Sequence, residues 1–225
     1  MSKKEDLTEK DIKQIFQMYK NAHRLKTILR TGWSRWGLDK KIRYESVAEH
    51  IYGCCMLALS IFANGGAKNL NVDKVFTMLV LHETEEIFIG DITPFDKKVV
   101  HKKELGKRAV KKFFRGAPNA DYFLKIIEEY EANETEEAKF ARRIDKLEAD
   151  IQAKYYDRHF IRKINQRVLK NERIMKYKSM GYTKVSDFFI LYDKHIFDDY
   201  FLKLLEYLEN DDEIDKEYDG GEKQN

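Results

Sequence analysis

Histidine and carboxylate side chains gather at the end of an apolar segment of this chain. His82 and Glu83 follow directly after the apolar run at residues 75–81. His50 lies in a second apolar segment upstream, and Asp145 lies in a charged segment downstream. Imidazole nitrogen and carboxylate oxygen bind divalent transition metals. Two imidazoles and two carboxylates from three helices could therefore surround one divalent metal, and such a site indicates a hydrolase.

Glu86 is placed to act on water at such a site. On an α-helix it lies four residues after His82 and therefore on the same face. A carboxylate there could position or deprotonate the attacking water, which is the general-base role that metal-assisted hydrolysis needs. Each residue also has an ordinary alternative. A histidine on an apolar helix can be a hydrogen-bonded core residue, Glu86 can lie on a solvated face, and Asp145 can pair with an arginine.

The segments that carry these residues are predicted to be helical almost throughout. Apolar residues recur at i, i+3 and i+4, which is typical of amphipathic helices. The expected helices span residues 8–30, 45–64, 71–90, 97–115, 119–132, 134–158, 160–180 and 185–209. Ser46 and Thr135 are expected N-caps, and Gly90 is expected to end the helix of His82. The fold class is therefore all-α.

Domain organisation follows from the same pattern. We expect a single-domain helical bundle of about eight helices over residues 1–210. Residues 211–225 are acidic and contain too few apolar residues to pack, so a disordered tail is expected there.

Composition limits the class of protein. The chain has 225 residues, enough for one large domain with a sizeable core, and 43% of them are hydrophobic. A net charge of only +3 gives little reason to expect nucleic-acid binding. No apolar run approaches the roughly 18 residues of a membrane span, and the start lacks the apolar segment of a secretory signal. We therefore expect a cytoplasmic protein with no nucleic-acid or membrane partner.

Two other features have ordinary interpretations. Cys54 and Cys55 are adjacent, which rules out a disulfide framework and favours two reduced core thiols. Lysines and arginines between residues 97 and 115 alternate with apolar residues. This run is interpreted as the solvated face of a helix, and the alternative is a positive rim that attracts a phosphorylated substrate.

An ordered series of sequence blocks resembles the HD-domain phosphohydrolase superfamily. The blocks are Arg30-Thr31-Gly32-Trp33, Glu45-Ser46-Val47-Ala48-Glu49-His50, His82-Glu83 with Glu86, Gly90-Asp91-Ile92-Thr93-Pro94, and Asp145. Within this superfamily the chain is similar to the 5'-deoxynucleotidase group, over residues 25–153. The series as a whole is specific, whereas a His-Glu pair alone would not be.

The resemblance implies an HD-type helical bundle that holds one divalent metal ion, which could be Co, Mn, Zn, Fe or Mg. The ligands that it implies are His50, His82, Glu83 and Asp145. Glu83 and Asp145 would also contact the substrate. One departure concerns the pair that names the superfamily, which is His-Asp there and His82-Glu83 here. Glutamate carries its carboxylate on a stem one methylene longer, so it either shifts the metal, binds it more loosely or misses it.

The resemblance also implies roles around the substrate. Glu86 and Asp91 would be catalytic, with Glu86 as the acid or base near the attacking water. Arg30 would bind the phosphate, for which a guanidinium offers charge-assisted hydrogen bonds. The other implied substrate contacts are Trp33 and, in the turn with Asp91, Ile92, Thr93 and Pro94.

The expected function is metal-dependent removal of the 5'-phosphate from (deoxy)nucleoside monophosphates by attack of a metal-bound water. The expected partner is thus a small phosphorylated molecule, a nucleotide, and the resemblance implies a homodimer. One alternative is an HD-type hydrolase of a cyclic dinucleotide, a nucleoside triphosphate or a non-nucleotide phosphate ester. The other alternative is a non-catalytic, ligand-sensing relative.

Overall fold

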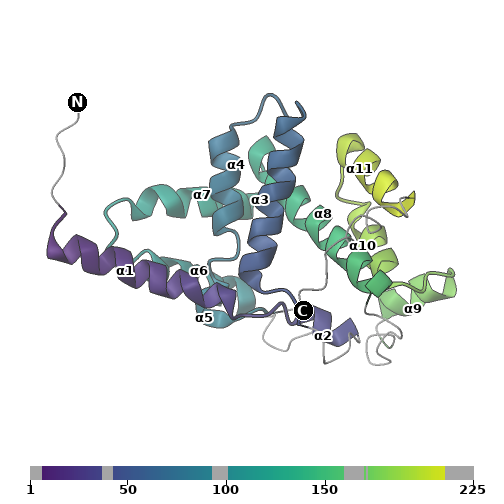
Figure 1. Ribbon diagram of the computed structural model, residues 1–225, viewed down its shortest axis with the longest axis horizontal. Coiled ribbons are helices and arrows are strands. Elements are labelled where there is room, and N and C mark those ends of the chain that lie inside the picture. Colours follow the sequence, from purple (N-terminus) through teal and green to yellow (C-terminus); the bar gives the residue numbers. More distant parts are fainter. Residues whose placement is uncertain (1–6, 37–42, 93–100, 160–169, 171, 211–225) are drawn as a thin grey trace, which may run out of the picture. The chain divides into compact units, whose positions relative to one another are not determined.

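The computed structural model describes residues 7–36, 43–92, 101–159, 170 and 172–210, and these residues are largely helical (Figure 1). Within these ranges the only extended pairing is an isolated antiparallel bridge between Leu29 and Ser46. No helix in the described ranges has the length and apolar content needed to cross a membrane. The predicted all-α class is confirmed.

The chain divides into two compact units. Unit 1 comprises Met1–Gly32 and Tyr44–Arg142, and unit 2 comprises Trp33–Arg43 and Arg143–Asn225. The single domain expected over residues 1–210 stays a prediction. The tail expected at residues 211–225 lies outside the described residues.

Helices make up both units. Unit 1 contains α1 (Glu9–His23), the 3-10 helix η1 (Arg24–Lys26), α3 (Val47–Ala63), α4 (Val72–Leu81), α5 (Glu86–Ile89), α6 (Lys102–Phe113) and α7 (Ala120–Ala132). Two helices begin in unit 1 and end in unit 2, namely α2 (Gly32–Trp36) and α8 (Glu136–His159). Unit 2 also contains α9 (Glu172–Ser179), α10 (Val185–Asp193) and α11 (Asp199–Asn210).

The predicted helix over residues 71–90 is wrong in its middle. Helix α4 ends at Leu81, and α5 begins at Glu86. The N–H of Thr84 donates to the Leu81 carbonyl, so the backbone between the helices is closed by a tight i→i+3 turn. The cause is the His82 imidazole, whose Nδ1 lies 2.6 Å from the carbonyl oxygen of Leu79. In a continuous α-helix that carbonyl would accept the N–H of Glu83, so the side chain competes with the helix.

Other expected helices are also divided, and α2 forms at Gly32–Trp36, where no helix was expected. The helix over residues 8–30 ends at His23 and continues as η1. The helix over residues 185–209 becomes α10 and α11. The second division arises because Asp198 starts a new helix, its carboxylate accepting the N–H of Phe201 at 3.1 Å.

A small apolar cluster in unit 1 positions the residues predicted to do chemistry. It consists of Leu25 of η1, Val47 of α3 and Ile87 of α5. Val47 lies three residues before His50, and Ile87 follows Glu86 directly. Burying these three side chains together therefore fixes the first turns of α3 and α5 relative to each other.

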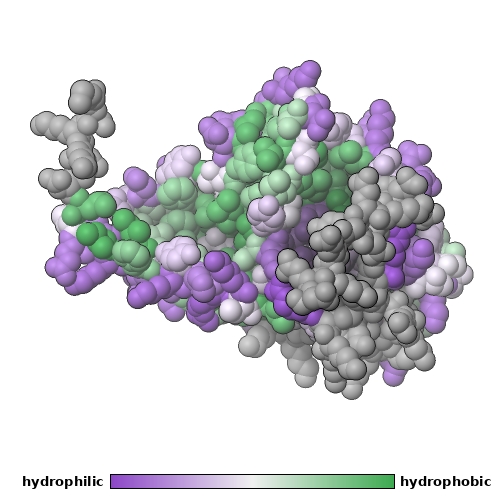
Figure 2. Space-filling view, viewed as in Figure 1, coloured by the Kyte–Doolittle hydropathy of each residue, from purple (hydrophilic) through white to green (hydrophobic). Residues whose placement is uncertain are grey.

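The surface of unit 1 carries apolar side chains beside charged ones. Figure 2 shows apolar colour over α3 and α4 and at the start of α1, with hydrophilic colour along the other edge of α1. Phe16 on α1 and both Met56 and Leu59 on α3 are among the exposed apolar side chains.

Unit 2 has an aromatic core. The ring of Trp33 stacks on Phe189 with centroids 5.3 Å apart, and Tyr156 meets it edge-on at 5.0 Å. The ring of Trp36 stacks on Phe188 at 5.7 Å. These contacts join α2, α8 and α10 by apolar burial and favourable ring geometry.

Two buried carboxyl groups interact in unit 2. Asp150 on α8 is fully buried, and Asp193 at the end of α10 is 2% exposed. Within the described structure, both carboxylate oxygens of Asp150 and one of Asp193 have no hydrogen-bond partner. Burial, and then repulsion by Asp193, raises the pKa of Asp150 well above its usual range. Burial raises the pKa of Asp193 to about 6, although Lys146 opposes the rise.

We predict that this pair makes the protein less stable as the pH rises. Asp193 keeps its proton in the folded chain up to about pH 6, whereas an unfolded aspartate releases it near 3.8. The folded state thus binds more protons over that window, and the free energy of unfolding falls as the pH rises through it. Asp193→Asn removes the charge, so it should unfold at higher urea concentration than wild type above pH 6, with a smaller difference near pH 4.

Asp199→Asn is a matched control, because Asp199 is exposed at the start of α11. Its urea midpoint should follow that of wild type at each pH. If Asp193→Asn gave no gain in stability at any pH, the raised pKa of Asp193 would not be a source of pH-dependent stability.

Candidate active site

The segment before α3 fixes the position of His50. The Oγ of Ser46 accepts the N–H of Glu49 at 3.3 Å, and the Glu49 carboxylate accepts the N–H of Ser46 at 2.7 Å. This reciprocal pair is a capping box, which satisfies two N–H groups that a helix start leaves without an intrahelical partner. The predicted N-cap at Ser46 is confirmed. His50 comes next in the chain and is fully buried.

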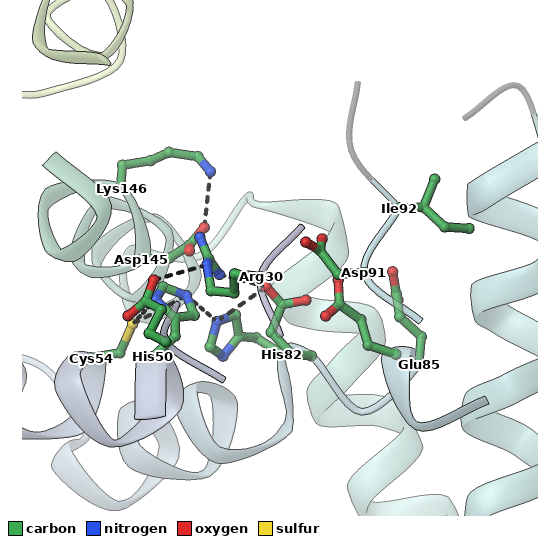
Figure 3. Close-up of polar contacts among 12 residues, drawn as sticks. Arg30, His50, Cys54, His82, Glu85, Asp91, Ile92, Asp145 and Lys146 are labelled. Atoms are coloured by element: carbon green, nitrogen blue, oxygen red, sulfur yellow. Dashed lines mark hydrogen bonds and ion pairs between the residues drawn. The ribbon is translucent and has the colours of Figure 1, made fainter. Parts of the chain in front are cut away.

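The imidazoles of His50 and His82 approach each other closely (Figure 3). Their Nε2 atoms are 3.3 Å apart. The contact between His82 Nδ1 and the Leu79 carbonyl places a proton on Nδ1 and leaves the Nε2 lone pair for a ligand. Two nitrogens that bind one tetrahedral ion at about 2.05 Å lie about 3.3 Å apart. The histidine pair therefore fits the separation that metal ligation requires.

A thiol that sequence analysis assigned to the core lies beside this pair. Cys54 is fully buried one helical turn after His50, and its Sγ is 3.6 Å from His50 Nε2. Donor atoms of His50, Cys54 and His82 all lie within 4.8 Å of one another. The signal in the sequence was the i, i+4 spacing of His50 and Cys54, which puts both on one face of a helix.

Glu83 lies between the histidine pair and Arg30. Its Oε1 is 3.8 Å from His82 Nε2 and 3.5 Å from Arg30 Nη1. The Nε of Arg30 is 3.2 Å from a carboxylate oxygen of Glu45, a partner that sequence analysis did not assign. The N–H of Arg30 also donates to the Glu45 carbonyl at 3.0 Å. Backbone and side chain together hold the guanidinium next to the histidines.

Glu86 belongs to a group of carboxylates that face one lysine. The Nζ of Lys102 on α6 is 3.8 Å from Glu86 Oε1 and 3.9 Å from Glu85 Oε1. Burial, and then the charges of Glu83 and Asp91, raises the pKa of Glu86 to about 10. Burial, and then the charge of Glu83, raises the pKa of Glu85 to about 7. Glu86 therefore holds a proton at neutral pH until positive charge arrives beside it.

Lys102 differs from other described residues of the basic run. Lys103, Lys107 and Lys111 are exposed, as the interpretation of a solvated face predicted. Lys102 is half-buried, and its Nζ donates to the carbonyl oxygen of Ile92 at 3.2 Å. The spacing in the sequence could have indicated this burial, because Lys102 lies one turn before Gly106 on the buried side of α6.

Asp91 ties the turn after α5 to the segment of Arg30. Its Oδ2 accepts the backbone N–H of Thr31 at 2.5 Å and the Thr31 hydroxyl at 2.9 Å. Gly90 precedes it with φ of 74°, a left-handed conformation that favours glycine. Ile92 is buried. Thr93 and Pro94, the other predicted contacts of this turn, lie outside the described residues.

Two predicted site residues belong to unit 2. Asp145 lies on α8, and its Oδ2 accepts a hydrogen bond from Lys146 Nζ at 3.0 Å (Figure 3). Trp33 lies in the aromatic core, and only 2% of its surface is exposed. The roles assigned to both residues by resemblance stay predictions.

The fold and the site define a helical protein with a candidate metal centre next to buried acids. A family model described as HD domain matches residues 22–181. The chain therefore belongs to the HD domain family.

Individual relatives support the same family. The 5'-deoxynucleotidase HDDC2 of Xenopus laevis is 31% identical over 150 residues, which are 64% of this chain and 70% of that protein. HDDC2 of Mus musculus is 31% identical over 138 residues, 59% of this chain and 65% of that protein. The match thus spans slightly less than two thirds of the mouse relative. The 5'-deoxynucleotidase hdd1 of Schizosaccharomyces pombe is 34% identical over 145 residues, 61% of this chain and 69% of that protein.

A solved structure is also similar. It is described as a predicted metal-dependent phosphohydrolase from Magnetospirillum magnetotacticum MS-1. The TM-score is 0.56 at 26% sequence identity, and the match covers 68% of this chain and 76% of that one.

The capping box before His50 gives a direct test of how α3 is held. Ser46→Ala should lower the free energy of unfolding by about 1 kcal/mol, because it removes the acceptor for an N–H of the first turn. Thr8→Ala is the matched control, since Thr8 forms the same motif on α1, a helix with no buried residue. Urea unfolding should show a smaller loss for Thr8→Ala. Equal losses in the free energy of unfolding would mean that the cap of α3 stabilises the protein no more than the cap of α1 does.

Proposed function

We propose that this chain is a metal-dependent phosphohydrolase that removes the 5'-phosphate from deoxynucleoside monophosphates. One observation supports this function most directly: two buried imidazoles present their Nε2 atoms 3.3 Å apart, with a guanidinium held next to them through Glu83. The names of the relatives as 5'-deoxynucleotidases support the substrate class. A homodimer and a cytoplasmic location, implied by resemblance and by composition, belong to the same proposal.

A divalent ion fits the donors of unit 1. His50 and His82 would hold it, with the Nδ1 contact of His82 fixing the ring. In this proposal Glu83 and Asp145 complete the set, as the resemblance implies. The ion, which could be Co, Mn, Zn, Fe or Mg, would supply a Lewis acid that polarises the phosphate and activates the attacking water.

Arg30 binds the substrate phosphate in this proposal. Its guanidinium is held by Glu45 and Glu83 at 3.2 Å and 3.5 Å, so its direction is set before substrate arrives. A guanidinium can meet two phosphate oxygens with parallel hydrogen bonds. Because its charge lies where negative charge grows on the phosphate, Arg30 stabilises the transition state more than the ground state.

Glu86 moves the protons. Its carboxyl group is buried, and its pKa lies far above the usual range of a glutamate. A divalent cation nearby lowers that pKa toward neutrality, where a group exchanges protons most effectively. Glu86 can then take a proton from the attacking water and return it to the leaving 5'-oxygen of the nucleoside. Asp91, Ile92, Thr93, Pro94 and Trp33 are the proposed contacts to the rest of the nucleotide.

We predict metal-dependent phosphate release from deoxynucleoside monophosphates. Purified protein, stripped with a chelator, should regain activity when Co, Mn, Mg or Zn is added singly. Glu86→Gln should lower kcat by about 10²- to 10⁴-fold, because the amide cannot transfer the proton. Glu85→Gln is the matched control, a neighbouring carboxylate that also faces Lys102, and it should lose less than tenfold. Absence of phosphate release in every metal would leave the ligand-sensing alternative.

Substitution of Arg30 tests whether the substrate is a monophosphate or another substrate of hydrolases in this family. Arg30→Ala should lower kcat/KM for a deoxynucleoside monophosphate by about 10²-fold or more, since it removes a charge from the transferring phosphate. Arg24→Ala changes an exposed arginine of η1 and should stay within about twofold of wild type. The measurement is steady-state kinetics on mono-, tri- and cyclic nucleotides. Preference for a triphosphate or a cyclic dinucleotide would replace the proposed substrate class.

A further inference from the structure

We infer that Lys102 is a positioning residue for the proposed reaction: its ammonium group holds the carboxyl group of Glu86 in the direction in which it transfers protons. The inference rests on the proposed function, because Glu86 is the acid or base of that function. It gives a role to a side chain that the sequence placed only in a basic run.

The ammonium group of Lys102 lies among oxygen atoms of α5 and of the turn after it. Its Nζ donates to the carbonyl oxygen of Ile92 at 3.2 Å. The same atom is 3.8 Å from Glu86 Oε1 and 3.9 Å from Glu85 Oε1. An ammonium group has several N–H donors and no acceptor, so it can serve a carbonyl and a carboxylate together. The bond to Ile92 therefore fixes the charge, and the fixed charge attracts the carboxylates.

Lys102 reaches this position because it belongs to the buried face of α6. Gly106 and Ala109 lie four and seven residues further along the helix, and both are buried. Residues at these spacings share one helix face. The Glu85 carboxylate occupies the space beside Gly106, where a Cβ would lie 2.9 Å from its Oε2. Lys103 is the next residue and is exposed, so the face alone distinguishes the two lysines.

Lys102 keeps its charge in this position. Burial lowers the pKa of this lysine, but the charges of Glu83, Glu86 and Glu85 outweigh burial and raise the pKa above its usual value. The side chain is 31% exposed, so solvent screens the charge only in part. A permanent positive charge therefore faces Glu86 from α6.

Glu86 needs a partner that sets its direction. Its carboxyl group sits on a flexible stem, and the charges of Glu83 and Asp91 oppose its carboxylate form. Lys102 and Arg30 favour that form, and Lys102 does so more strongly. Catalysis depends steeply on such placement, since a displacement of about 1 Å can lower a rate about 10²-fold. The contact with Lys102 thus limits how far the carboxyl group can move.

A double-mutant cycle tests whether Lys102 acts through Glu86. In the metal-loaded full chain, Lys102→Met should lower kcat for a deoxynucleoside monophosphate by about 10- to 100-fold, because Glu86 is no longer held. In the Glu86→Gln background the same substitution should change kcat less than about twofold, because no catalytic carboxylate is left to position. A merely structural role would lower kcat by the same factor in both backgrounds.

Three further variants complete the experiment. Lys102→Arg keeps a charge and N–H donors, so its kcat should return to within about threefold of wild type. Lys103→Met is the matched control, an exposed neighbour whose charge is screened by solvent, and its kcat should stay within about twofold of wild type. Lys102→Gln is a second neutral variant in case methionine perturbs packing. Thermal melts check that each variant folds.

The outcomes separate the inference from the proposed function. A loss of kcat that disappears in the Glu86→Gln background and is recovered by Lys102→Arg supports the positioning role. The role is overturned by unchanged kcat in Lys102→Met and Lys102→Gln, by an equal loss in both backgrounds, or by a loss that Lys102→Arg does not recover. In each of these cases, phosphate release by wild type still upholds the proposed function. A wild-type chain that releases no phosphate from any nucleotide overturns the proposed function, and the inference with it.

Discussion

The arrangement of side chains in unit 1 depends on how the protein offsets buried negative charges next to two imidazoles. The carboxylates of Glu45 and Glu83 lie near the Arg30 guanidinium, and that of Glu86 lies near Lys102. Burying an uncompensated charge is costly, so Glu86 keeps its proton instead. A divalent cation at the histidine pair would offset this charge, and its binding would then also stabilise the fold. The same buried charges thus affect both the stability of the fold and the proposed chemistry.

Local backbone features turn this arrangement into a rigid site. The capping box of Ser46 and Glu49 starts α3 at Val47, three residues before His50. The bridge at Leu29 holds Arg30 against Glu45. The break after Leu81 lets His82 turn toward α3 and directs Glu83 toward the guanidinium. Each feature pairs backbone groups that have no partner within a regular helix.

Unit 2 also contains buried acids, but these acids avoid a buried charge by keeping their protons. Asp150 and Asp193 lie in a largely aromatic and aliphatic core, where they retain a proton that a solvated pair would release. Lys146 lowers the pKa of both acids but is already bonded to Asp145. The pair therefore makes the stability of this unit sensitive to pH.

The sequence by itself determined the helical class, the cap at Ser46 and, by resemblance, the family, and it singled out His50 and His82 as candidate metal donors. Period and capping chemistry are local, so they can be recognised without the fold. Only the tertiary structure decided the break after Leu81, the burial of Lys102 and the approach of Cys54 to His50. These features arise when side chains from distant segments compete for the same carbonyl, charge or donor position. Spacing along one helix shows which residues share a face, but it does not show what that face meets.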